Sequence, residues 1–225
     1  MHVAPANEID TDVAIGPRSL PGQLVIPARA RGLVIFAHGS GSSRLSPRNI
    51  YAAEQLRKRG FATLLFDLLT AAESADRRNV FDIPLLARRV GEAIAWARAD
   101  ARTSALPIGL FGASTGAGAA IAAAAAHAGN VDAIVSRGGR PDLAGDALEQ
   151  VEAGVLLVVG SEDREVIQLN RMAQRLMHCE TKLVIVPGAG HLFEEPGTLD
   201  EGLNAAGDWF ATHIGEDHHA PTSFS

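Results

Sequence analysis

The feature that most constrains the fold is the pentapeptide Gly-Ala-Ser-Thr-Gly at residues 112–116, which has the form G-x-S-x-G. The apolar run before it, at 106–111, is typical of a short buried strand, and the alanine-rich run after it, at 118–126, predicts a helix. A sharp turn between a strand and a helix exposes the hydroxyl of Ser114 where the helix start points unpaired N–H groups toward it. Side chains at either glycine would clash with the neighbouring strand and helix. Without that context, the pattern would equally fit a glycine-rich turn that contains a serine.

Short apolar runs alternate with longer helical segments along the chain, and this alternation predicts an α/β fold with a mostly parallel central sheet. We expect about eight strands, with helices on both faces of the sheet. The expected strands are 12–15, 23–26, 32–37, 61–66, 106–111, 131–135, 155–159 and 183–186, with a turn at Pro21-Gly22 between the first two. The expected helices are 46–59, 83–101, 118–126, 146–151, 166–178 and 199–213.

The length of 225 residues suits a single domain, for which we expect a core at about 10–214 and a peripheral polar tail at 215–225. Hydrophobic residues make up 47% of the chain, which is ordinary for a globular protein. The stretch between Val135 and Val155 has room for only a short helix, so no lid domain is expected.

Charge and composition exclude several classes of protein. The net charge of −6 argues against a nucleic-acid-binding surface, which would need a basic excess. The single cysteine, Cys179, cannot form an intrachain disulfide, the first residues lack a signal-peptide pattern, and no apolar run is long enough to span a membrane. We therefore expect a cytoplasmic protein with no membrane partner. A homodimer is compatible with the sequence, which does not itself decide the oligomeric state.

A serine nucleophile needs a general base and a group that orients the base, and in this kind of fold they follow in the order serine, acid, histidine. The strand at 155–159 leads into Gly-Ser-Glu-Asp, and the strand at 183–186 leads into Pro-Gly-Ala-Gly-His. The carboxyl ends of parallel strands meet at one edge of a sheet. We therefore predict His191 as the base and Asp163 as the acid. Asp163 is preferred over Glu162 and Glu165 because it holds the last position before a helix.

The segment His-Gly-Ser-Gly-Ser at 38–42 follows another predicted strand at the same edge. Acyl transfer places negative charge on the former carbonyl oxygen, which two backbone N–H groups should meet. We predict the amides of Thr115 and Ser40 as these donors, with Gly41 as the alternative to Ser40. His38, at the strand end, is expected to be a buried structural histidine that hydrogen-bonds the loop.

Together these motifs resemble those of α/β-hydrolases, and more narrowly of the dienelactone hydrolase-like group. The likeness runs from Gly32 to His213 and rests on His38-Gly39, residues 112–116, Asp163 and His191. It implies the α/β-hydrolase fold, transfer of an acyl group to Ser114, and hydrolysis by a water that His191 deprotonates. Dienelactone hydrolases proper have cysteine as the nucleophile, so the serine here favours a general esterase or lactonase over hydrolysis of dienelactone itself.

Two arginines, Arg137 and Arg140, follow the predicted strand at 131–135. Arginine is suited to bidentate recognition of carboxylate or phosphate, so one hypothesis is that Arg137 or Arg140 binds an anionic group of the substrate or of its leaving group. The structural alternative, which we favour, is that these arginines pair with Asp142, Asp163 or Glu194 to hold loops.

The sequence thus predicts a serine hydrolase for small soluble carboxylic esters or lactones, with no cofactor and no metal. The adjacent His218 and His219 lack a carboxylate or cysteine partner and are a weak metal signal. A peptidase or thioesterase could use the same three residues, because they act on any acyl carbonyl. From a different class, the chain could be a binding or regulatory module on a hydrolase scaffold.

Overall fold

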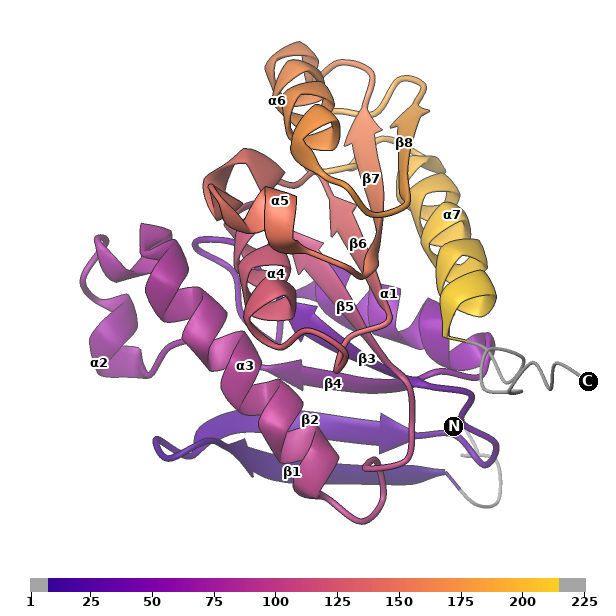
Figure 1. Cartoon of the computed structure of the whole chain (residues 1–225). Coiled ribbons are helices and arrows are strands. Elements are labelled where there is room, and N and C mark those ends of the chain that lie inside the picture. The colour runs from indigo at the N-terminus through magenta and orange to yellow at the C-terminus, as the bar shows by residue number, and fades with distance from the viewer. Residues whose placement is uncertain (1–7, 215–225) are drawn as a thin grey trace, which may run out of the picture.

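The computed structural model describes residues 8–214, which form one eight-stranded sheet with helices on both faces (Figure 1). The strand order is β1-β2-β4-β3-β5-β6-β7-β8, and every neighbouring pair from β4 to β8 is parallel. β1 and β2 form an antiparallel hairpin whose second strand adds, again antiparallel, to β4. The predicted mostly parallel sheet of about eight strands is confirmed.

The strands are β1 (Ile9–Ile15), β2 (Leu20–Ile26), β3 (Leu33–Ala37), β4 (Ala62–Phe66), β5 (Ile108–Ala113), β6 (Ala133–Arg137), β7 (Gly154–Gly160) and β8 (Thr181–Val186). The α-helices are α1 (Pro47–Lys58), α2 (Ala71–Ser74), α3 (Ile83–Ala99), α4 (Thr115–Ala126), α5 (Ala147–Gln150), α6 (Arg164–Leu176) and α7 (Thr198–His213). Two short 3₁₀ helices are η1 (Asn79–Phe81) and η2 (Pro141–Ala144).

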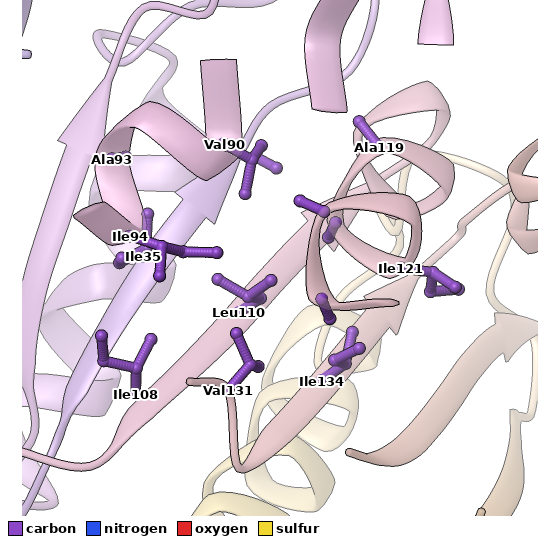
Figure 2. Packing of buried hydrophobic residues seen from close by; sticks show 14 of the residues in the cluster. Ile35, Val90, Ala93, Ile94, Ile108, Leu110, Ala119, Ile121, Val131 and Ile134 are labelled. Atoms are coloured by element: carbon purple, nitrogen blue, oxygen red, sulfur yellow. The ribbon is translucent and has the colours of Figure 1, made fainter. Parts of the chain in front are cut away.

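The sheet is buried on both faces, which is why its central strands are continuously apolar. Helices α3, α4, α5 and α6 cover one face, and α1 and α7 cover the other (Figure 1). Figure 2 shows the first of these layers, where Val90 and Ile94 of α3 and Ile121 of α4 lie over Leu110 and Ile134 of the sheet. The alanine-rich composition of α4 lets it sit close to both the sheet and α3.

The expected turn at Pro21-Gly22 is wrong, because both residues lie within β2, where Pro21 pairs with Ala14 of β1. The hairpin turns earlier, between Gly16 and Ser19, whose amide donates to the Gly16 carbonyl at 3.1 Å. Gly16 and Ser19 both have positive φ. Serine is not a residue type that favours positive φ, so the sequence did not indicate a turn at Ser19. A proline near the start of a strand is tolerated because only its N–H is missing from the ladder.

The short helix α2 was also not predicted, and it is held by side chains from two segments. Thr70 caps it in a capping box, with the Glu73 amide donating to Thr70 Oγ1 at 3.2 Å and the Thr70 amide donating to Glu73 Oε2 at 2.9 Å. The guanidinium of Arg89 in α3 is 2% exposed and pairs with both Glu73, at 2.8 Å, and Glu92, at 2.9 Å. These ion pairs attach α2 to α3.

The predicted tail at 215–225, including His218 and His219, lies outside the described residues.

Candidate active site

Ser114 lies at the junction of β5 and α4 with φ 50° and ψ −124°, a backbone conformation that non-glycine residues rarely adopt. The flanking glycines make this turn sterically feasible. A Cβ on Gly112 would lie 2.5 Å from Cα of Ala117, and one on Gly116 would collide with the carbonyl oxygen of Ala37. The structure contains the strand, turn and helix expected from the sequence. The serine side chain is half-buried at the carboxyl end of β5.

Asp163 and His191 lie on adjacent loops, after β7 and β8 respectively. Nδ1 of His191 is 2.6 Å from Oδ2 of Asp163. A carboxylate can only accept hydrogen bonds, so Nδ1 is the donor and the lone pair of Nε2 is free to take a proton. The two loops are joined directly, because the Glu162 amide donates to the carbonyl of Ala189 at 3.0 Å. The structure thus brings Asp163, and not Glu162, against the histidine; the Glu162 carboxylate accepts instead from Ser161 Oγ at 3.0 Å.

Ser114 and His191 line the same cavity, of about 600 Å³, which we call the nucleophile cavity; its wall also includes the loop 39–43. The His191 side chain is 42% exposed and that of Asp163 only 16%, so the imidazole faces the cavity mouth and the carboxylate lies behind it. Within residues 8–214, the Ser114 hydroxyl has no hydrogen-bond partner, so its contact with His191 is not closed in this structure. Catalytic hydrogen bonds commonly tighten only when substrate is bound.

The two residues predicted as oxyanion donors, Ser40 and Thr115, are joined by a hydrogen bond that the sequence did not predict. The Ser40 amide donates to Oγ1 of Thr115 at 3.0 Å, so this donor already has an acceptor. Thr115 is the first residue of α4, and its own amide is one of the N–H groups that a helix start leaves without a helical partner. An oxyanion at this point would therefore compete with the threonine hydroxyl for the Ser40 N–H.

His38 has the structural role expected of it. Its Nε2 accepts a hydrogen bond from the Leu68 amide at 3.1 Å, so Nδ1 carries the proton and donates to the Gly39 carbonyl at 3.0 Å. Burial lowers the pKa of His38, which favours this neutral form. The ring thus fastens the loop at 39–43 to the segment after β4.

Arg137 and Arg140, which the sequence analysis treated as a pair, have different surroundings in the structure. Arg140 forms a bidentate pair with Asp142 at 2.8 and 2.7 Å, as the structural alternative predicted, and does not line the nucleophile cavity. Arg137 does line it; this residue ends β6 beside Ala113 of β5 and is 9% exposed. Its guanidinium carbon lies 5.6 Å from the ring centroid of Phe193.

Two residues at the site were missed by sequence reasoning. Arg48 of α1 lines the nucleophile cavity and donates to Glu194 at 2.9 Å. Glu195 accepts a hydrogen bond from the Gly190 amide at 3.0 Å and so holds the loop that carries His191. Neither residue lies in a recognisable motif: Arg48 contacts a residue 146 positions away in the sequence, and Glu195 acts through a contact within its own loop. No cluster of three or more metal-ligating side chains occurs among residues 8–214, and no helix in that range is long and apolar enough to cross a membrane.

Comparison with known proteins places this arrangement in a family. The model of the dienelactone hydrolase family matches residues 20–214, which include Ser114, Asp163 and His191. The chain belongs to the dienelactone hydrolase family. The crystal structure of a dienelactone hydrolase from Anabaena variabilis is 50% identical and has a TM-score of 0.89, over 92% of this chain and 98% of that one. The resemblance stated from the motifs is thus confirmed.

More distant structures of dienelactone hydrolase-like and esterase proteins share the fold. Est1E from Butyrivibrio proteoclasticus has a TM-score of 0.74 at 16% identity, over 90% of this chain and 98% of that one. A promiscuous phosphotriesterase from metagenomic libraries, described as dienelactone hydrolase-like, has a TM-score of 0.75 at 18% identity, over 92% and 99% of the two chains.

Curated relatives from two strains of Mycobacterium tuberculosis are 54% identical over 210 residues, and their names assign them provisionally as phosphoribosyl transferases. This dienelactone hydrolase family chain aligns over 93% of its own length but spans only 47% of theirs. The name therefore describes proteins about twice as long as the region that matches.

Proposed function

We propose that this member of the dienelactone hydrolase family is a serine hydrolase of small carboxylic esters or lactones. The observation that carries the proposal is the 2.6 Å contact between Asp163 and His191 at the rim of the cavity that Ser114 lines. The positive φ of Ser114 supports it, because strained backbone persists where the surrounding structure enforces it and is concentrated at active sites. Membership of a hydrolase family and the likeness to esterase structures agree with this chemistry.

In the proposed mechanism, Oγ of Ser114 attacks the acyl carbonyl while Nε2 of His191 accepts its proton. Asp163 orients the imidazole and stabilises the imidazolium that forms. The Thr115 and Ser40 amides donate to the oxyanion, which takes the place of the Thr115 hydroxyl as the acceptor for Ser40. His191 then protonates the leaving group, and it later deprotonates the water that hydrolyses the acyl-enzyme.

An apolar cavity next to the nucleophile cavity supports a substrate of limited size. It has a volume of about 440 Å³ and shares the loop 39–43 as a common wall. Its far side is formed by Leu68, Leu69, Val80 and Leu86. We propose that a short apolar arm of the substrate enters this cavity while the scissile carbonyl stays beside Ser114.

Two other activities have to be weighed against this proposal. A peptidase or thioesterase would employ the same three residues, and only turnover of matched substrates separates them. The phosphoribosyl transferase name of the mycobacterial relatives belongs to longer proteins, and we do not assign that activity to the region that this chain matches.

The experiment is labelling with a fluorophosphonate, which reacts with activated serines, followed by mapping of the modified residue. We expect modification of Ser114 in the wild type and none in Ser114→Ala. A panel of p-nitrophenyl esters, lactones and acyl thioesters then ranks the substrate classes. A folded wild-type protein that is neither labelled nor active would favour a binding module on a hydrolase scaffold.

A further inference from the structure

Thr115 brings two polar groups to the site, its backbone amide and its side-chain hydroxyl. The residue follows Ser114 directly, at the start of α4, and its Oγ1 accepts a hydrogen bond from the Ser40 amide at 3.0 Å. The threonine is only 4% exposed. A buried hydroxyl normally has a hydrogen-bond partner, and the partner here is the same N–H group that the mechanism assigns to the oxyanion.

The contact between Ser40 and Thr115 lies against the reacting serine. Gly39, the residue before Ser40, is so close to Ser114 that a Cβ on Gly39 would lie 2.9 Å from the Cβ of Ser114. Covalent geometry keeps Oγ1 of a threonine within about 4 Å of its own amide nitrogen. The hydroxyl oxygen therefore lies close to both of the amides that would bind an oxyanion, those of Ser40 and Thr115.

A single hydrogen bond, from Ser40 to Thr115, joins the loop 39–43 to α4 in the part of the chain that the structure describes. The other side of the loop is fastened elsewhere, because the Arg44 amide donates to Oδ1 of Asp67 at 2.8 Å. A Cβ on Gly41, at the tip of the loop, would meet no residue within 4 Å other than its chain neighbours. The direction of the Ser40 amide thus depends on its acceptor in α4.

An acceptor that stayed in place would compete with the oxyanion for the Ser40 amide, so the hydroxyl has to be able to leave. A threonine side chain in a helix populates two staggered χ1 positions. The oxygen of Thr115 can therefore move away by rotation about one bond, without displacement of the loop. The Ser40 amide then donates to a charged oxygen, and such hydrogen bonds are roughly twice as strong as those between neutral groups. The exchange favours the state in which negative charge has formed.

We propose that the hydroxyl of Thr115 is a positioning group for the reaction. In the free enzyme it holds the Ser40 amide in the direction of the oxyanion, and it gives up that amide as the charge forms. The inference rests on the proposed function, because it concerns the same acyl transfer. The hydroxyl acts through Ser40 and needs no contact with the substrate. Without it, the amide would turn toward water, and every turnover would have to reorient it.

The first test removes the acceptor and keeps the shape of the side chain. Thr115→Val replaces the hydroxyl with a methyl group, and the turnover of p-nitrophenyl butyrate gives kcat and KM. We expect kcat to fall by about 10- to 100-fold, which is at most the effect of losing one oxyanion donor. KM should change by less than about threefold, because the exchange of acceptors occurs only as the transition state forms.

Matched variants separate the acceptor from the bulk of the side chain. Thr115→Ser restores an oxygen and should recover most of the lost kcat, whereas Thr115→Ala, which has neither the oxygen nor the methyl group, should not. Thr63→Val is the control for loss of a buried threonine hydroxyl. Oγ1 of Thr63 also accepts a hydrogen bond, from Arg57 at 3.1 Å, and Thr63 lines neither cavity. This variant should keep the kcat of the wild type.

Circular dichroism reports whether each variant is folded, and Thr115→Ala answers the question if Thr115→Val does not fold. A kcat in the folded variant that equals or exceeds that of the wild type overturns the proposal. The same holds if Thr115→Ser or Thr63→Val loses as much kcat as Thr115→Val does.

The second test observes the Ser40 amide itself and needs no catalysis. Its hydrogen exchange is followed by NMR in isotope-labelled protein. We expect slow exchange in the wild type and in Thr115→Ser, and exchange at least about tenfold faster in Thr115→Val. Modification of Ser114 by the fluorophosphonate places a phosphonyl oxygen where the oxyanion would form, so it should slow the exchange again in Thr115→Val.

The two tests distinguish failure of this inference from failure of the proposed function. An active wild type in which the Ser40 amide exchanges as fast as in Thr115→Val refutes the positioning role and leaves the hydrolase in place. Slow exchange that depends on Thr115, in a folded protein that is neither active nor labelled, overturns the hydrolase and leaves only a structural contact.

Discussion

Asp163 and His191 are 28 residues apart in the sequence, yet Oδ2 of one and Nδ1 of the other lie 2.6 Å apart. The contact is possible because β7 and β8 are adjacent parallel strands and both residues follow their carboxyl ends. The Ser161 amide donates to the Val186 carbonyl at 2.9 Å, which joins the two loops through the backbone. Asp163 and His191 are therefore one hydrogen-bonded unit, whereas Ser114 reaches the cavity independently, from β5.

The first prediction follows from this unit. In Asp163→Asn the new amide can donate to Nδ1, which stabilises the tautomer whose Nε2 carries a proton and cannot act as a base. We expect kcat to fall by about 10⁴-fold with little loss of folded protein, as for the equivalent change in other catalytic triads. Steady-state kinetics on a p-nitrophenyl ester measures it.

The matched control is Glu162→Gln, one residue away and exposed, which should stay within about twofold of the wild type. If Asp163→Asn kept a tenth or more of wild-type kcat, or if Glu162→Gln lost as much activity, Asp163 would not be the orienting acid.

The second prediction concerns the strain at Ser114. Its φ of 50° with ψ of −124° costs a non-glycine residue on the order of 1–3 kcal/mol, and glycine adopts it readily. Ser114→Gly should therefore be more stable than Ser114→Ala by about 1 kcal/mol, equivalent to 2–4 °C in Tm for a domain of this size, after the entropy that glycine gains on unfolding. Both variants lack the nucleophile, so their comparison isolates the backbone. Equal Tm values would mean that the turn at Ser114 carries no strain.

The sequence was sufficient for the fold and for the contact between acid and base, because both follow from local patterns. Continuous apolar runs mark buried parallel strands, and loops after such strands share one edge. The turn of the first hairpin was misplaced because Ser19 adopts a positive φ without a residue type that favours it.

The finer features of the site depend on contacts between distant segments. Arg137 and Arg140 have the same side chain and are three positions apart. Arg137 is the last residue of β6 and lines the cavity, whereas Arg140 pairs with Asp142. The bond from Ser40 to Thr115 and the approach of Arg48 involve loops and helices whose packing no periodicity encodes.

The third prediction is a pH dependence of stability. The backbone hydrogen bond from Thr70, followed by the charge of Arg89, lowers the pKa of Glu73 below its ordinary value of 4.5. A carboxyl whose pKa is lower in the folded state stabilises the fold above its unfolded pKa, and this stabilisation is lost as pH falls through the folded pKa. We expect Tm to decline below about pH 4.5 more steeply in the wild type than in Glu73→Gln.

Thermal unfolding between pH 7 and pH 3 measures this difference, with Glu149→Gln as the control. Glu149 is exposed, and its carboxylate makes no ion pair within the part of the chain that the structure describes. Its replacement should leave the slope of the wild type unchanged. Parallel curves for wild type and Glu73→Gln would show that the contacts of Glu73 add nothing to stability in acid.

The last prediction tests the close approach of β5 and α4 beneath the nucleophile. A methyl group on Gly112 would meet three backbone atoms, Cα and N of Ala117 at 2.5 and 2.8 Å and the Gly116 carbonyl oxygen at 2.9 Å. Backbone cannot rotate aside as a side chain can, so Gly112→Ala should destabilise the fold by about 1–3 kcal/mol in urea unfolding. The start of α4 must also shift, and with it Ser114 and the Thr115 amide, so fluorophosphonate labelling should slow even in the fraction that remains folded.

Gly202→Ala is the natural comparison, because Gly202 is also a buried glycine at a helix–sheet contact. The nearest atom to its added methyl group is a side-chain carbon, Cγ1 of Val158, at 3.3 Å. A small adjustment of that valine accommodates the methyl, and alanine is the better helix former by about 1 kcal/mol, so this variant should be as stable as the wild type or more so. If the two glycine variants lost equal stability, the cost would be a general effect of filling the core. A loss confined to Gly112→Ala would locate the cost at the contact between β5 and α4 that shapes the turn at Ser114.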